Sequence, residues 1–372
     1  MGMRCCKCAG KISVPTYRLT TYDLQLTTYD LQLTTYDLQL TTYDLQTNKP
    51  MQKPYALLFF LMLAATAGFA QQPGQYSLYM LNPHAWNPAY AGLDHSLSFT
   101  GVYRQQWAGL PGNPVTQNVN AHLPVYFLSG GFGLNLENES LGAQRITTSS
   151  ASFNYQRDLG KGILSLGLSA GLAQRSIDGS KLRTPDGLYT EPGVIDHGEG
   201  NLPVGTESAI TPTFHAGVYY QSQRLEAGFA VQNLTSPEAE LGDLRITMIR
   251  NYFFTFAMHL EAGRNWSVHP SVLARADAAQ LQLDFSGIVR YNDNIFAGAS
   301  LRGYNSNSLD AISILAGFKL SEKITLAYAY DVTLSALNSV SNGSHEIMLN
   351  YNLQQPIGKG RPPRIIYNPR SL

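Results

Sequence analysis

Cysteine is nearly absent from this chain of 372 residues, and its three copies, Cys5, Cys6 and Cys8, all lie close to the first residue. Such a cluster could bind zinc, but a structural zinc site needs four protein ligands and a fourth is missing. Beyond these positions there is no cysteine, which excludes disulfide bonds and thiol chemistry from the rest of the chain.

Charge and long apolar runs are scarce as well. The 26 Lys and Arg residues balance the 26 Asp and Glu residues, so the basic excess of nucleic-acid-binding proteins is absent. Charged residues make up 14% of the chain, whereas soluble domains have about 25%. The apolar run Ala56–Ala65 is too short for a membrane-spanning helix of about 20 residues. No later stretch reaches that length, so any membrane-spanning part must consist of strands.

Residues 1–70 differ in character from the rest of the chain. In residues 1–50, a Thr-Thr-Tyr-Asp-Leu-Gln-Leu unit recurs at a strict period of seven from Leu19 to Gln46. A coiled coil would need an apolar seam flanked by charge pairs, which this unit does not provide. We interpret it as a low-complexity leader, translated from repeat DNA ahead of the true start. Residues 51–70 have the features of a secretory signal peptide, with Lys53, the apolar run and a cleavage site after Ala70.

The chain beyond Ala70 is rich in alternating apolar and small polar residues. In Ile163–Ala173, leucines and Ala170 fall on one face of an extended chain, and serines and glycines fall on the other. The sequence also has 22 Tyr, 15 Phe and 33 Gly, and aromatic girdles flank the apolar band of membrane barrels. One alternating strand would also suit a soluble sandwich. The choice between a sandwich and a membrane barrel therefore depends on the number and spacing of such stretches.

Fourteen candidate strands succeed one another. They are 96–106, 115–125, 130–138, 145–156, 162–174, 212–220, 224–232, 251–260, 266–275, 281–291, 295–303, 311–320, 324–332 and 345–353. Nearly all are close to the 9–11 residues that a tilted strand needs to cross a membrane. Short connections mostly come after the even-numbered strands, and the longest connections come after odd-numbered ones. This parity is typical of an outer-membrane barrel. We therefore predict an all-β fold, a transmembrane antiparallel β-barrel of about 14 strands at 96–353, with both termini in the periplasm.

Two segments flank the predicted barrel. Residues 71–95 contain two Asn-Pro pairs, which block helix and disfavour a strand, so we predict an ordered periplasmic turn or plug. The candidate residues of this segment either seal the periplasmic mouth of the barrel or form a docking surface. They are Asn82, Pro83, Asn87, Pro88 and Tyr90. Residues 354–372 are rich in proline and basic, and they are either a solvated extension or a cationic periplasmic docking site. Its basic residues are Lys359, Arg361, Arg364 and Arg370.

Arg104 and Trp107 end the first strand, near the expected outer rim. One interpretation is an aromatic-belt tryptophan with an arginine that snorkels to the lipid headgroups. The other is that both residues brace a plug or bind a partner.

The sequence predicts no catalytic, cofactor-binding or metal-binding residue. His122, His215 and His259 fall within predicted strands, but a hydrolase needs a serine, a histidine and an orienting group that converge. The neighbours Ser344-His345 and Asp196-His197 do not establish such convergence. The longest loop is acidic but lacks the ligand spacing of a calcium-binding loop. Its acidic residues are Asp178, Asp186, Glu191, Asp196, Glu199 and Glu207.

Three blocks resemble one known family. Residues 75–92 read Gln-Tyr-Ser-Leu-Tyr-Met-Leu-Asn-Pro-His-Ala-Trp-Asn-Pro-Ala-Tyr-Ala-Gly, Tyr103 opens Tyr-Arg-Gln-Gln-Trp, and Pro114-Val115-Thr116 comes next. Together they resemble the PorP/SprF family, outer-membrane proteins of type IX secretion and gliding motility in Bacteroidetes. The resemblance covers the chain after the signal peptide, whereas the repeat leader matches no family pattern.

The resemblance implies a non-enzymatic role without cofactors. Family members help to export, or retain at the cell surface, a partner protein with a type IX C-terminal sorting domain. They also contact periplasmic components of the machinery, including a peptidoglycan-binding protein. The alternating barrel alone leaves open a second hypothesis, a porin-like passive channel for small solutes.

Overall fold

The computed structural model describes residues 74–189, 195–198, 202–242, 244–277, 280–304 and 309–355. The leader, the signal peptide and the four basic tail residues Lys359, Arg361, Arg364 and Arg370 lie outside these ranges. The expectations about them therefore stay predictions.

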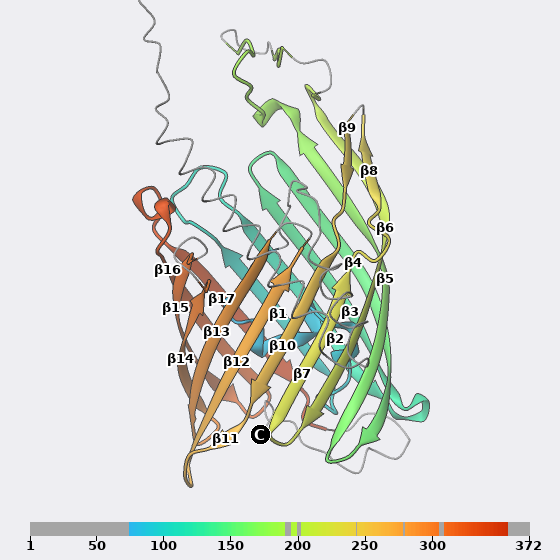
Figure 1. Cartoon of the computed structure of the whole chain (residues 1–372), viewed down its shortest axis with the longest axis vertical. Coiled ribbons are helices and arrows are strands. Elements are labelled where there is room, and N and C mark those ends of the chain that lie inside the picture. The colour runs from blue at the N-terminus through green and yellow to red at the C-terminus, as the bar shows by residue number, and fades with distance from the viewer. Residues whose placement is uncertain are drawn as a thin grey trace, which may run out of the picture. The chain divides into compact units, whose positions relative to one another are not determined.

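Fourteen antiparallel strands form a closed barrel, which confirms the predicted fold class (Figure 1). They are β1 (Ser98–Gln105), β2 (Val115–Val125), β3 (Gly130–Leu141), β4 (Gln144–Leu159), β5 (Gly162–Asp178), β6 (Thr206–Ser222), β7 (Leu225–Gln232), β10 (Asn251–Met258), β12 (Trp266–Ala276), β13 (Leu281–Tyr291), β14 (Ile295–Arg302), β15 (Ala311–Ser321), β16 (Ile324–Thr333) and β17 (Ser344–Asn352). Each strand pairs with its neighbours in the sequence, and β1 pairs with β17 from Ser98↔Asn352 to Gln105↔His345. Closure leaves no unpaired sheet edge facing lipid.

Three short strands complete the sheet structure. β11 (Leu260–Glu261) continues the course of β10 along β12. β8 (Glu238–Leu241) and β9 (Leu244–Thr247) form a separate hairpin between β7 and β10. The sequence predicted a plain connection here, because four-residue strands carry too little alternation to be recognised.

The alternation along each strand separates a lipid-facing wall from a polar interior. On β5, Leu166 and Leu168 are 56% and 68% exposed, whereas Ser165 and Ser169 are buried. The same inversion recurs on β13, where Phe285 is exposed and Asp284 is buried. Among the described residues, no helix is long and apolar enough to span a membrane.

The connections define two ends of the barrel. We call one end the loop end; its described residues are 106–114, 142–143, 179–189, 195–198, 202–205, 233–242, 244–250, 277, 280, 303–304, 309–310 and 334–343. The opposite end, with residues 126–129, 160–161, 223–224, 259–265, 292–294 and 322–323, is the turn end. Three 3₁₀ turns lie in these connections: η4 (Tyr126–Leu128), η5 (Gly179–Lys181) and η6 (Ala336–Ser339).

Candidate functional site inside the barrel

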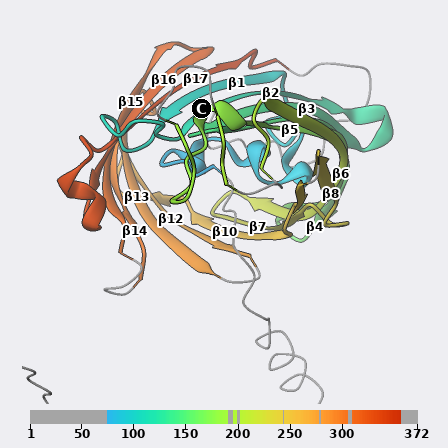
Figure 2. The same ribbon diagram turned by 90° about the horizontal axis from the view of Figure 1, so that it is seen from above.

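Residues 74–97, which we call the lumenal segment, run through the barrel from the loop end to the turn end. At the loop end, Arg275 of β12 donates a hydrogen bond to the carbonyl of Gly74 over 3.3 Å. At the turn end, the hydroxyl of Ser96 accepts a hydrogen bond from the backbone N–H of Gln355 over 3.3 Å. Figure 2 shows the segment's blue turns inside the ring of strands. The first and last described residues, Gly74 and Gln355, thus lie at opposite ends of the barrel. The expectation that both termini face the periplasm concerns residues outside the described ranges.

The segment folds into three 3₁₀ turns, and its prolines explain two of them. They are η1 (Tyr79–Leu81), η2 (Pro83–Ala85) and η3 (Pro88–Tyr90). Pro83 and Pro88 each occupy the first position of a turn, where the fixed φ suits the backbone and the missing N–H leaves no partner unsatisfied. The Asn-Pro pairs therefore set where the chain turns.

Arg104 holds the start of the segment through a buried ionic cluster. Its side chain is 0% exposed, and its guanidinium lies 2.7 Å from a carboxylate oxygen of Asp331 and 3.0 Å from one of Glu346. It also donates to the Ser77 hydroxyl over 2.9 Å, which in turn donates to Asp331 over 2.6 Å. Arg302 of β14 donates to the same serine and to Asp331. The interpretation of Arg104 as a snorkelling side chain at the rim is therefore wrong. The residue faces the lumen because it alternates with the outward-facing Tyr103.

Glu346 extends this cluster to the backbone of the segment. Its carboxylate accepts the N–H of Ser77 over 2.6 Å and the N–H of Leu78 over 3.1 Å. Removing one partner of a buried ion pair costs about 3–5 kcal/mol, because a charge is left uncompensated. The cluster therefore couples the position of the segment to four strands of the wall, β1, β14, β16 and β17.

Asn87 connects the third turn to the opposite wall. Its side-chain oxygen accepts the N–H of Ala89 over 2.9 Å, which caps η3. Its amide nitrogen donates to the carbonyls of Val218 and Phe229 over 3.0 and 3.2 Å. Gly217 of β6 leaves room for this contact, since a Cβ there would collide with the Asn87 side-chain oxygen.

The wall supplies donors to the carbonyls of the third turn. Asn154 of β4 donates to the carbonyls of Ala89 and Ala91 over 2.9 and 2.6 Å. The Ser165 hydroxyl of β5 donates to Ala89 over 2.6 Å. Gly167 lies against this turn, and a Cβ there would meet the backbone of Ala89. The small polar face that the sequence shows on β5 is thus the surface on which the turn rests.

Tyr90 and Asn82 are both buried in the lumen. Tyr90 is 1% exposed, donates to Asp94 over 2.6 Å and packs edge-on against Tyr219 of β6. Asn82 is 7% exposed and accepts a hydrogen bond from the Asn120 side chain over 3.0 Å. All five candidate residues between Asn82 and Tyr90 therefore contact one another or the wall of the barrel.

Two further residues of the second sequence block, Tyr103 and Trp107, lie apart from the segment. Tyr103 is 44% exposed on the outer face of β1. Trp107 lies in the connection after β1 in a left-handed conformation with φ of 47°, and its N–H donates to the Ser344 hydroxyl over 3.1 Å. The structure thus brings Arg104, but not Tyr103 or Trp107, into contact with the lumenal segment.

Burial also changes the titration of the segment. His84 is 4% exposed and packs edge-on against His122 of β2, and burial lowers its pKa well below the ordinary value. The positive charge that His122 can carry lowers the pKa of His84 further. His84 therefore stays neutral in its observed position.

Sequence reasoning missed the partners of Arg104 and Asn87. Asp331 and Glu346 are acidic residues on the inward face of strands whose other face is apolar, and such a residue needs a buried partner. That signal was present, but pairing with Arg104 requires the closure of the barrel. The neighbours Ser344 and His345 have different partners, since the Ser344 hydroxyl accepts the Trp107 N–H and His345 contacts the Tyr328 hydroxyl over 2.7 Å. Within the described ranges, no group of three His, Cys, Asp or Glu side chains could hold a metal ion.

Comparisons with known proteins place the chain in context. The family described as type IX secretion system membrane protein PorP/SprF matches residues 68–351. No curated protein matches the sequence. Among solved structures, the toluene transporter TbuX of Ralstonia pickettii is similar with 13% identity and a TM-score of 0.42, over 72% of this chain and 91% of that one. The outer membrane protein Omp33 of Acinetobacter baumannii has 5% identity and a TM-score of 0.40, over 69% of this chain and 98% of that one.

Proposed function

Because this chain belongs to the PorP/SprF family of type IX secretion system membrane proteins, we propose that it helps to export a partner protein or anchors it at the cell surface. The partner would carry a type IX C-terminal sorting domain. The chain acts as a non-enzymatic barrel in the outer membrane and serves the secretion and gliding machinery.

One observation favours this role over that of a porin-like channel. The lumenal segment runs the length of the barrel, and the ionic cluster around Ser77 and the capped turn at Asn87 fix it in the lumen. A passive pore for small solutes needs an open lumen. A barrel that binds other proteins does not, and a filled interior preserves the permeability barrier while it works.

The lengths of the connections indicate how the barrel is oriented. The longest connections lie at the loop end, which we assign to the cell exterior, as in other outer-membrane barrels. The turn end and the last described residues then face the periplasm. There the basic tail, with Lys359, Arg361, Arg364 and Arg370, would dock periplasmic components such as a peptidoglycan-binding protein.

Two measurements test the proposal. Affinity purification of the tagged protein from outer membranes should recover a large protein with a C-terminal sorting domain. Replacing the four basic tail residues with glutamine should reduce recovery of the periplasmic component and leave recovery of the sorting-domain protein unchanged. Recovery of lipid and porins alone would contradict the proposal.

The porin hypothesis is tested in planar bilayers. The purified protein should show no steady conductance, and a variant that lacks residues 74–95 should conduct if the remaining barrel stays folded. A steady open channel in the unmodified protein would favour the porin hypothesis instead.

A further inference from the structure

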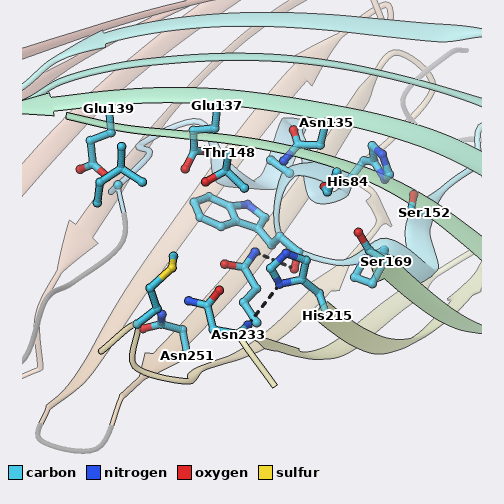
Figure 3. A pocket seen from close by; sticks show the side chains of 18 of the residues that line it. His84, Asn135, Glu137, Glu139, Thr148, Ser152, Ser169, His215, Asn233 and Asn251 are labelled. Carbon is cyan, nitrogen blue, oxygen red and sulfur yellow. Dashed lines mark hydrogen bonds between the residues drawn. The ribbon is translucent and has the colours of Figure 1, made fainter. Parts of the chain in front are cut away.

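A cavity lies in the lumen beside the lumenal segment, towards the loop end (Figure 3). It has about 1050 Å³ of empty space, which includes space open to solvent. Residues of β3, β4, β5 and β6 form one side of it, and Trp86 of the segment also lines it. The ionic cluster at Arg104 and the capped turn at Asn87 hold the segment that closes its other side.

The cavity is long rather than round. Arg175 of β5 lies at one end, and its neighbour across the sheet is Ile146 of β4. Ser152, on the same strand as Ile146, lies near the other end with His84. Ser152 lies six positions along the strand from Ile146, which corresponds to about 20 Å. A ligand that contacts both ends must therefore be longer than a single sugar ring or amino acid.

Polar groups in this cavity are buried without partners. Arg175 is 3% exposed, and its Nε and Nη1 atoms have no hydrogen-bond partner among the described residues. The same holds for the indole N–H of Trp86 and for both ring nitrogens of His84, whose residues are each 4% exposed. Two more groups lack a partner: the Ser152 hydroxyl, which can donate or accept a hydrogen bond, and the Asn251 side-chain oxygen, which can accept one. Buried polar groups are normally satisfied, so this concentration at one cavity indicates a ligand with many hydrogen-bonding groups.

The charges in the cavity determine the class of that ligand. Arg175 at the loop end has two carboxylates of β3 near it, Glu139 and Glu137, and Glu137 accepts a hydrogen bond from the Tyr76 hydroxyl over 2.6 Å. The lining therefore has no excess of positive charge that would select an anionic ligand. The unpartnered groups include donors and acceptors, and a hydroxyl group can serve either. Ile146, Met248 and Ala85 provide apolar surface between the polar groups. We propose that the cavity binds a short neutral oligosaccharide, whose hydroxyls satisfy Arg175, Trp86, His84 and Ser152 along its length.

An isothermal titration of the purified chain tests this site. The protein should be prepared in a detergent without a sugar headgroup, because maltoside and glucoside detergents would compete. The probes are maltotriose, cellotriose and chitotriose, with acetylated triglycine as a peptide of comparable length. Replacing Trp107 and Trp266 with phenylalanine leaves Trp86 as the single tryptophan of the described chain, so its emission reports occupancy directly.

We expect at least one trisaccharide to bind saturably and to change the Trp86 emission. Arg175→Gln should weaken this binding about tenfold or more, because two charge-assisted hydrogen bonds are lost. Arg157→Gln is the matched control, since Arg157 is exposed on β4 away from the lumen, and it should bind like the unmodified protein. A shift in gel migration between unheated and heated samples, equal to that of the unmodified protein, verifies that each variant is folded.

Three outcomes would overturn the proposal. The first is no saturable binding of any trisaccharide by the folded protein. The second is binding that Arg175→Gln leaves unchanged. The third is tight binding of triglycine that depends on Arg175 while the trisaccharides fail, which would assign the cavity to an extended polypeptide. None of these outcomes depends on whether the barrel exports or anchors a sorting-domain protein.

Discussion

Replacing Arg104 with methionine should release the start of the lumenal segment without opening the barrel wall. Methionine keeps much of the side-chain volume and removes the charge. The cluster then loses Arg104 and keeps Arg302 as its arginine, beside the two carboxylates of Asp331 and Glu346. The uncompensated carboxylates would then be stabilised by moving towards solvent. This movement would weaken the hydrogen bonds that Ser77 makes to Asp331 and Glu346.

The magnitude is set by the loss of a buried charge partner. Breaking such a pair costs about 3–5 kcal/mol, and we take about 3 kcal/mol because water in the lumen can solvate part of the freed charge. Since about 1.4 kcal/mol corresponds to a factor of ten, the released population should rise about 100-fold. The loss acts on the segment more than on the wall, because the hydrogen-bond ladders of β1 with β2 and β17 do not depend on the guanidinium.

Hydrogen exchange measures this release directly. The backbone N–H groups of Ser77 and Leu78 donate to Glu346, so their protection reports the attachment of the segment. In Arg104→Met their protection should fall about 100-fold, while strand amides keep theirs. Arg157→Met, an exposed arginine on β4, serves as the control.

A double variant separates charge from packing. Adding Glu346→Gln to Arg104→Met removes one of the uncompensated charges, so the double variant should lose less protection than the sum of the two single variants. Unchanged protection at Ser77 and Leu78 in folded Arg104→Met would refute the reasoning. So would equal loss in Arg157→Met.

Two further predictions concern the middle of the segment, with Trp86 quenching by acrylamide as the common measurement. Gly217→Ala places a Cβ against the Asn87 side chain and should displace the third turn at a cost of about 1–3 kcal/mol. Gly287→Ala, where a Cβ meets nothing within 4 Å, should not; equal quenching in the two variants would contradict the close approach. Because burial lowers the pKa of His84, the released segment binds a proton more readily than the docked one. Docking should therefore be fully stable above about pH 6.5 and weaken as the pH falls below it, and His84→Gln should flatten that dependence. The charged or titratable groups around His84 are His122 and its partner Asp94.

The sequence was sufficient to predict the barrel because alternation and connection parity are local properties. The apolar face of Ile163–Ala173 predicts an outward wall because the same alternation recurs in fourteen stretches, and the structure confirms its outward leucines. Strand ends were less accurate. β5 and β6 extend to Asp178 and Thr206, beyond their predicted ends, because pairing between them compensates for weak alternation there.

The site was harder to predict because its contacts join residues distant in sequence. Arg104 and Glu346 are 242 positions apart and become neighbours only when β1 closes on β17. A rim arginine and a lumenal arginine look alike in sequence, since both come after an apolar residue near a strand end. The two cases differ in which face of the strand carries the arginine. Arg104 alternates with Tyr103 and is on the same face as Val102 and Thr100, which β1 buries.

The attachments of the lumenal segment differ along its length, and this determines how it could open. At the loop end the segment is held by a hydrogen bond from Arg275 to a backbone carbonyl and by side-chain amides such as the pair of Gln75 with Gln106. Deeper in the lumen it is held by the ionic cluster at Ser77, whose charge-assisted bonds are stronger. Local opening begins where attachments are weakest. A partner that approaches from the loop end would therefore meet the least firmly held part of the segment first. It would have to disrupt the Arg104 cluster before the lumen could open, so protection in hydrogen exchange should increase from Gly74 towards Leu78. A uniform loss of protection along the segment would show instead that it detaches as a single unit.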